Sequence, residues 1–147
     1  MKKLIIKSPA FENNTLIPAK YTCDGAEVNP PLTIEDVPEG TKSIVLIIDD
    51  PDAAAGIWNH WLVWNIPPTT RKIKANTVPG TEGINTSGKR AYDGPCPPSG
   101  THRYYFKVYA LNRELELNPN SQKKDVEKAM EGRTLATGEL IGLYHRT

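Results

Sequence analysis

Residues 47–67 read IIDDPDAAAGIWNHWLVWNIP, and the rest of the predicted fold is organised around them. It begins at the end of the apolar run Ile44–Ile48, which is long enough for one buried strand. Aspartates and a turn of small residues follow, and the chain then enters an aromatic strand that carries His60. Two strands expected to be buried therefore meet at a polar loop with several acids and one histidine. Acids at a strand end often form only a turn, so a functional interpretation depends on a second histidine motif later in the chain.

Length and charge limit the classes of protein that fit. At 147 residues, the chain is most simply one domain over 1–147, which removes roughly 68–70% of its unfolded surface from water. Its 18 basic and 17 acidic residues leave a net charge of +1, which gives no electrostatic case for binding nucleic acid or a membrane. The N-terminal apolar run is too short for a signal peptide, and no run approaches membrane-spanning length. We therefore expect no membrane insertion and a cytoplasmic location.

The clearest strand covers residues 102–111. Strict alternation places Tyr104 and Phe106 on one face, with His102 in register with them, and places Lys107 on the other face. The last segment, 135–144, carries two glycines and is predicted to be a bent strand rather than a helix.

One short helix is expected near residues 122–131. Ser121 can act as its N-cap, and Gly132 can end it. Strands at many points, one helix and no strand–helix–strand alternation together favour a mainly β fold, an antiparallel β-sandwich.

Residues 67–101 are rich in proline and glycine and show no sustained periodicity. Structureless segments of this length in compact domains are usually functional or disordered. Four apolar side chains could pin the segment to the body of the protein, namely Ile73, Val78, Ile84 and Tyr92. The part from 92 to 101 is expected to be rigid, because each proline fixes its own φ and restricts the residue before it.

Three tryptophans lie at a spacing of three in the aromatic strand. Regular alternation places Trp58 and Trp64 on one face and Trp61 on the other, which most simply means packing in the core and on the sheet. Lining of a pocket by Trp58 is the alternative.

Two motifs carry groups suited to binding an anion: Asp50-Pro-Asp52 followed by His60, and the block 94–104, GPCPPSGTHRY. Two imidazoles and a tyrosine hydroxyl can each donate a hydrogen bond to an oxyanion. Carboxylates beside histidines fix the ring tautomer and favour the doubly protonated, donating form. The same carboxylates repel a dianion, so a monoanion or a phosphate that carries an amine fits better. A buried His60 satisfied by a neighbour is the purely structural alternative.

Two other chemistries use the same residues. A metal site could be built from His60, His102 and an aspartate, but no metal-ligand spacing is present. A hydrolase could use Ser99 with His102, but the chain has no Gly-x-Ser-x-Gly elbow. We therefore expect a protein that is not an enzyme and has no metal and no cofactor.

At these motifs the chain resembles the phosphatidylethanolamine-binding proteins, and within them the bacterial and archaeal Raf-kinase-inhibitor-like branch. The resemblance covers nearly the whole chain. Besides the two histidine motifs, it rests on Cys-Asp-Gly at 23–25, Pro-Pro-Leu at 30–32, His-Trp-Leu-Val at 60–63 and Asn-Ile-Pro at 65–67. The chain differs from the family pattern at Ala54, where the family usually has a proline. A proline there would restrict the conformation of the loop, so this difference affects the expected direction of the Asp52 side chain.

The resemblance implies a large sheet packed on a smaller one and a small pocket for anions such as phosphate, sulfate or a phospholipid head group. By motif match, the ligand-binding residues are Asp50, Asp52, His60, Gly94, Pro95, His102 and Tyr104. The family carries Cys23 and Cys96 together, which implies that they lie close enough to form a disulfide. Prokaryotic relatives suggest a homodimer. The alternative function is an interaction module that inhibits a protease or a kinase.

Overall fold

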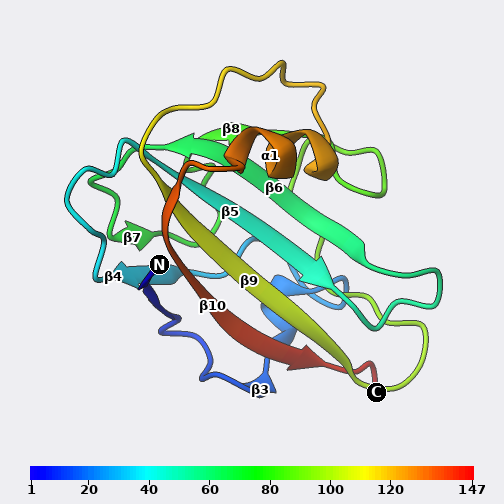
Figure 1. The fold of residues 1–147 in the computed structure, drawn as a ribbon. Helices are drawn as coiled ribbons and strands as arrows, with labels where there is room; N and C mark the ends of the chain where they lie inside the picture. Colours follow the sequence, from blue (N-terminus) through cyan, green and yellow to red (C-terminus); the bar gives the residue numbers. More distant parts are fainter.

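Two β-sheets and one α-helix make up the computed structural model, which describes residues 1–147 (Figure 1). The larger sheet runs β1 (Lys2–Lys3), β10 (Thr134–Tyr144), β9 (His102–Leu111), β5 (Ser43–Asp50), β6 (Trp58–Ile66) and β8 (Thr81–Glu82), and β3 (Thr15–Leu16) also pairs with β10. The smaller sheet contains β2 (Ile5–Lys7), β4 (Leu32–Glu35) and β7 (Lys72–Ile73). The helices are α1 (Lys123–Met130) and a short 3₁₀ turn, η1 (Ala19–Tyr21).

The prediction of a mainly β fold, with a large sheet, a smaller sheet and one short helix, is confirmed. The structure adds that the large sheet is mixed. Its central strands are antiparallel, but β1 and β3 run parallel to β10 at the edge. These edge strands have only two residues each, too few for a sequence pattern to show their direction.

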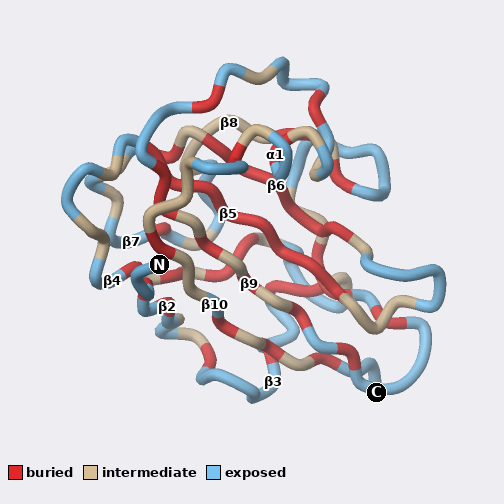
Figure 2. The backbone as a smooth tube through the Cα atoms, in the orientation of Figure 1, coloured by how far each residue is buried: buried red, intermediate tan, exposed pale blue.

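Two hydrophobic clusters lie on opposite faces of the large sheet. Alternate residues of β5 divide between them: Ile44 and Leu46 face the small sheet, whereas Val45 and Ile47 face α1. Because both faces are covered, all of β5 is buried (Figure 2). Burial on both sides explains why residues 44–48 of this strand form an unbroken apolar run.

α1 covers one face of the large sheet through Val126 and Met130, both buried. Its N-cap is Gln122 and not Ser121, so that prediction is wrong. The backbone N–H of Gln122 donates to the Asp125 carboxylate at 2.8 Å, and the Gln122 side chain accepts from the backbone N–H of Asp125, which together form a capping box at the start of the helix. Gly132 follows the helix with φ +73°, and the predicted C-terminal stop is confirmed. No helix in the structure has the length and apolar character needed to cross a membrane.

β6 contains two β-bulges, which change the faces of its side chains. Ile48 pairs with Trp61 and Asp49 pairs with Asn59, so His60 is the extra residue at the first bulge. A second shift in register lies nearer the end of the strand, where Asn65 adopts φ +52°. An extra residue in one strand re-aims the side chains on one side of it relative to the other.

The bulge at His60 makes the predicted arrangement of the tryptophans wrong. Trp58 pairs with Asp50 and Trp61 pairs with Ile48, so both lie on the face toward the small sheet. Trp64 belongs to the cluster under α1. Trp58 and Trp64 therefore lie on opposite faces.

The proline-rich segment 67–101 is fixed to the body at several points. Ile73 is buried in β7, and the ring of Tyr92 packs edge-on against Trp61 with centroids 5.6 Å apart. Ile84 is half-buried, but Val78 is 59% exposed and does not serve as an anchor.

Candidate functional site

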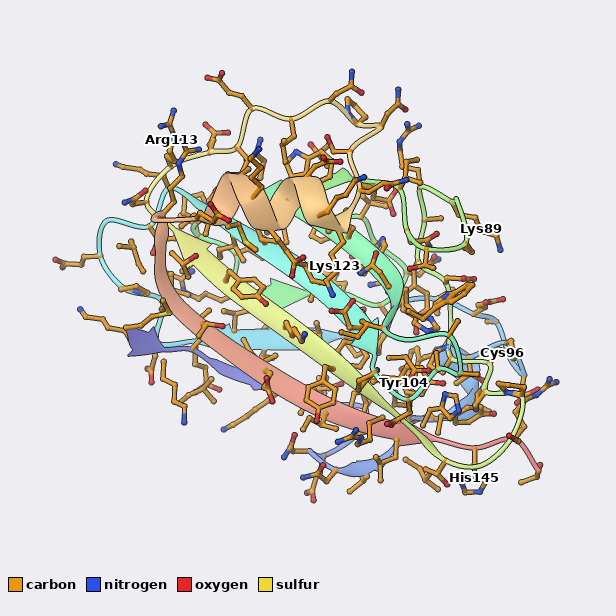
Figure 3. All side chains as sticks on the ribbon, turned by 45° about the vertical axis from the view of Figure 1, so that its right-hand side comes forward. Lys89, Cys96, Tyr104, Arg113, Lys123 and His145 are labelled. Atoms are coloured by element: carbon orange, nitrogen blue, oxygen red, sulfur yellow. A yellow bond between two sulfur atoms is a disulfide. The ribbon has the colours of Figure 1, made fainter.

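A cavity of about 490 Å³ opens where β5, β6 and β9 meet three loops. Of the residues predicted to bind a ligand, five line it: Asp50, His60, Gly94, His102 and Tyr104. Asp52 and Pro95 do not. Trp58 also lines the cavity, as the alternative interpretation of that residue expected. Tyr104 and the Cys96 loop lie at the end of the large sheet away from α1 (Figure 3).

His102 and Asp50 form a buried pair on this cavity. The Nδ1 of His102 lies 2.7 Å from Oδ2 of Asp50, and the two residues are 9% and 3% exposed. An ionised carboxylate only accepts hydrogen bonds, so Nδ1 carries the proton and Nε2 is the nitrogen left for the cavity. The other carboxylate oxygen of Asp50 accepts the backbone N–H of Asp52 at 2.7 Å.

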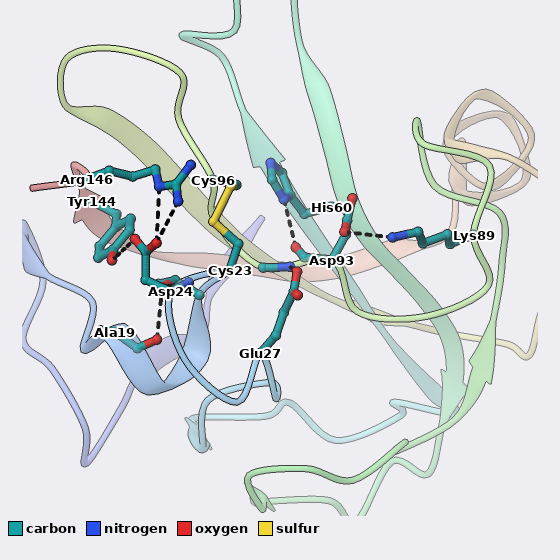
Figure 4. Close-up of a disulfide and its surroundings, with 12 residues drawn as sticks. Ala19, Cys23, Asp24, Glu27, His60, Lys89, Asp93, Cys96, Tyr144 and Arg146 are labelled. Carbon is teal, nitrogen blue, oxygen red and sulfur yellow. Dashed lines mark hydrogen bonds and ion pairs between the residues drawn. A yellow bond between two sulfur atoms is a disulfide. The ribbon is translucent and has the colours of Figure 1, made fainter.

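His60 is held in a similar way by a different acceptor. Its Nδ1 lies 2.7 Å from the carbonyl oxygen of Asp93 (Figure 4). A carbonyl oxygen can only accept, so Nδ1 again donates and Nε2 is left for the cavity. The backbone oxygen of His60 accepts from the Asp93 N–H at 3.1 Å and from the Asn85 amide at 3.0 Å. The bulge in β6 is what places this ring on the cavity side.

Tyr104 lies between the two imidazoles. Its ring meets His60 edge-on with centroids 5.3 Å apart and is stacked near His102 at 6.4 Å. Burial is the main cause that raises its pKa far above the ordinary value, with Asp50 second, so the hydroxyl keeps its proton. The hydroxyl oxygen is buried and has no hydrogen-bond partner. Buried polar atoms of this kind are uncommon and call for an explanation.

Asp52 binds Arg103 through its carboxylate instead of lining the cavity. Its carboxylate accepts three hydrogen bonds from Arg103, one from the backbone N–H and two from the guanidinium, each of 2.9 Å. The Arg103 side-chain hydrogen bonds are the main cause that lowers the pKa of Asp52 to about 2. The residue therefore ties the loop after β5 to the start of β9 and does not face the cavity. Ala54, in the same loop, does line it.

Two acids that sequence reasoning missed also line the cavity, Glu27 and Asp93. Glu27 has φ +57°, and its Oε2 accepts the N–H of Gly94 at 3.0 Å. The Asp93 carboxylate lies 3.5 Å from Nζ of Lys89. Glu27 lies two residues after the Cys-Asp-Gly motif, and Asp93 lies directly before Gly94. This proximity to the family motifs is the one feature of the sequence that could have identified them. With Asp50, they give the cavity three carboxylates beside two imidazoles.

Pro95 and Gly94 shape the wall rather than contribute side-chain chemistry. The carbonyl oxygen of Pro95 accepts the N–H of Cys23 at 3.1 Å. A Cβ on Gly94 would lie 2.9 Å from the carbonyl oxygen of Tyr21, so only glycine lets the two loops approach this closely.

Cys23 and Cys96 form a disulfide, with Cα atoms 5.5 Å apart, and both line the cavity (Figure 4). Ser99 lies in the exposed part of the loop and does not line it. No group of three or more His, Cys, Asp or Glu side chains is arranged to hold a metal ion.

Comparison with known proteins shows the family of this chain. The family model for phosphatidylethanolamine-binding protein matches residues 7–145. A UPF0098 protein of Aquifex aeolicus is 51% identical over 95% of this chain and 86% of its own length, and one of Methanothermobacter thermautotrophicus is 47% identical over 96% and 98%.

Two solved structures have the same fold over the whole chain. The phosphatidylethanolamine-binding protein homologue CT736 of Chlamydia trachomatis is 38% identical, with a TM-score of 0.96 and complete coverage of both chains. YbcL of E. coli, described as a member of the mammalian family, is 29% identical, with a TM-score of 0.89 and 99% coverage of both chains. The chain belongs to the phosphatidylethanolamine-binding protein family.

Proposed function

We propose that this protein is a binding protein, not an enzyme, and that it holds a singly charged oxyanion, such as a phosphodiester or monoanionic phosphate, between His60 and His102. The observation that carries the proposal is that each of these rings has its Nδ1 bound to a group that can only accept. Both rings line one cavity, and in each the nitrogen left over is Nε2. When protonated, both Nε2 atoms become donors.

The hydroxyl of Tyr104 supports an oxyanion as the ligand. It retains its proton, it is buried, and it lacks an acceptor. An oxyanion oxygen placed between the imidazoles would supply that acceptor. Burying a polar group without a partner costs about 1–3 kcal/mol, so binding would recover free energy that the unliganded protein gives up.

The acids limit the charge of the ligand. Asp50 is paired with His102, but Glu27 and Asp93 add negative charge to the same cavity. A dianion would be repelled, whereas a monoanion or a phosphate that also carries an amine would not. Phosphorylethanolamine has this combination, and the family to which the chain belongs is named for a lipid with that head group.

The rest of the wall favours an apolar substituent on the anion. Three alanines from the loop after β5, the ring of Trp58 and the prolines 97 and 98 line the cavity. A phosphodiester with an alkyl or aromatic group would therefore place its charge on the imidazoles and its apolar part against this wall.

Titration of phosphate and of phosphorylethanolamine tests the site. Each charged hydrogen bond to an imidazole contributes about 1.5–3 kcal/mol, so His60→Ala and His102→Ala should each bind about tenfold to a hundredfold more weakly than the wild type. The matched control is His145→Ala, because His145 is exposed and is not part of the cavity. Equal affinities in all four proteins would overturn the proposal.

A screen with ester, peptide and phosphoester substrates tests the second part of the proposal. We expect no turnover. Activity that is lost in Ser99→Ala, or on addition of a chelator, would show that the protein is an enzyme.

A further inference from the structure

The wall of the cavity has one section that no hydrogen bond holds. From Pro97 to Thr101, no hydrogen bond or ion pair joins the chain to the rest of the protein. Pro97 is buried, but residues 98–101 are all exposed. This section supplies two residues of the cavity lining, Pro97 and Pro98, and leads directly into His102.

The hydrogen bonds that fasten the loop all lie before this section. The Tyr92 hydroxyl donates to the carbonyl of Tyr21 at 2.7 Å, and the Gly94 N–H donates to Glu27 at 3.0 Å. The carbonyl of Pro95 accepts from the Cys23 N–H at 3.1 Å. The disulfide at Cys96 is therefore the last covalent or hydrogen-bonded tie before β9, and it joins two loops that line the cavity (Figure 4).

The disulfide can be reached from outside. Cys96 is exposed and Cys23 is half-buried, and both border the open cavity. Exposed disulfides are the ones that exchange with external thiols, because the attacking thiolate must approach one sulfur directly.

We propose that the Cys23–Cys96 disulfide is a redox control on ligand binding, so that reduction by a dithiol frees residues 97–101 and weakens the affinity of the cavity. This inference rests on the proposed anion site. A thiolate of the dithiol attacks Sγ of Cys96, forms a mixed disulfide and releases the Cys23 thiolate, which takes up a proton. The second thiol of the reductant then displaces Cys96. Two electrons and two protons pass to the protein, and the dithiol becomes a cyclic disulfide.

Reduction weakens binding for an entropic reason. With the bridge intact, the wall section is already fixed when the ligand arrives. Without it, the section moves, and ligand binding must order it again at the cost of backbone freedom. The hydrogen bonds before Cys96 remain, so the protein stays folded and the effect is confined to the cavity.

The test compares phosphate affinity, measured by calorimetry at pH 6, in three forms: oxidised wild type, wild type reduced with dithiothreitol, and the Cys23→Ser/Cys96→Ser variant. We expect the reduced form to bind at least about tenfold more weakly, because ordering the backbone of even one residue of the section costs about that factor. The double variant should match the reduced form and should not respond to dithiothreitol. Near-ultraviolet circular dichroism, recorded on each form, reports whether the protein is folded.

Each result decides the question. Equal affinities of the oxidised and reduced forms would overturn the redox control and leave the anion site standing. Loss of the circular dichroism signal of the folded state, both in reduced wild type and in the double variant, would also overturn the redox control. The bridge would then act on the stability of the whole protein and not on the cavity alone. Absence of phosphate binding in the oxidised protein would overturn the proposed function and this inference with it.

Discussion

Asp49 and Asp50 are neighbours at the end of β5, yet they belong to different regions of the molecule. Asp49 points toward α1, where its carboxylate lies 3.2 Å from Nζ of Lys107 and 2.6 Å from Nζ of Lys123. Asp50 points to the opposite face, where it holds His102 at 2.7 Å beside the cavity. Both side chains are almost fully buried.

The difference lies in the partners. Asp49 meets the ammonium groups of two lysines, one on β9 and one on α1, so its region is an ionic contact between the sheet and the helix. Asp50 meets a single imidazole and an open cavity. A single step along a strand therefore separates a structural carboxylate from one suited to binding.

Asp49→Ala should have the largest effect on stability. It leaves two lysines without their buried partner, and breaking a buried ion pair in this way costs about 3–5 kcal/mol. Urea unfolding measures the loss. Glu35→Ala is the matched control, since it breaks an ion pair with Lys7 in which both side chains are at least half exposed. The comparison also predicts that phosphate affinity stays within about twofold of the wild type; a larger change would show that the two regions are coupled.

Asn59→Ala should destabilise the protein less but should affect both regions. The Asn59 amide donates to the carbonyls of Ile48 and Trp61 and to the Asp49 carboxylate, and so holds the bulge that turns His60 toward the cavity. The loss of buried hydrogen bonds should cost about 1–3 kcal/mol. Phosphate affinity should fall as well, because His60 loses its fixed direction. Full affinity in a destabilised variant would show that the bulge does not need this side chain.

Asp50→Asn should weaken phosphate binding at a smaller cost in stability. An amide has one oxygen, so it can accept from Nδ1 of His102 or from the backbone N–H of Asp52, but not from both. The negative charge beside His102 is also lost. Phosphate affinity measured by calorimetry should therefore fall relative to the wild type, with His145→Ala as the matched control. Unchanged affinity would remove Asp50 from the role assigned to it.

Much of the fold could be predicted from the sequence because its strongest patterns are local. The apolar run in β5 and the alternation in β9 need no distant partner to be recognised, and they placed His102 and Tyr104 on one face correctly. The bulge at His60 could not be predicted, since it is a mismatch in pairing between two strands and leaves no mark on β6 alone.

The missed parts of the site have a similar cause. Glu27 borders the cavity because Gly94, 67 residues further on, donates to its carboxylate. Asp52 does not face the cavity because Arg103, 51 residues further along the chain, donates hydrogen bonds to its carboxylate. Contacts between loops of this sequence separation are set by the whole fold, whereas the motif match to the family carries only the residue types.

Asp52→Asn should show the smallest effect on stability, and the size of that effect depends on pH. Hydrogen bonds from Arg103 lower the folded-state pKa of Asp52 to about 2, below the ordinary value of 3.8. A carboxyl with a lowered folded-state pKa stabilises the protein fully above its unfolded value and loses that contribution as pH falls through the folded value. The pair is partly exposed, so the loss at pH 7 should be well below that of Asp49→Ala. Thermal midpoints of the two proteins should differ at pH 7, converge between about pH 4 and pH 2, and coincide below that. A difference that persists at the lowest pH would mean that Asp52 acts through its shape in the loop rather than through its charge.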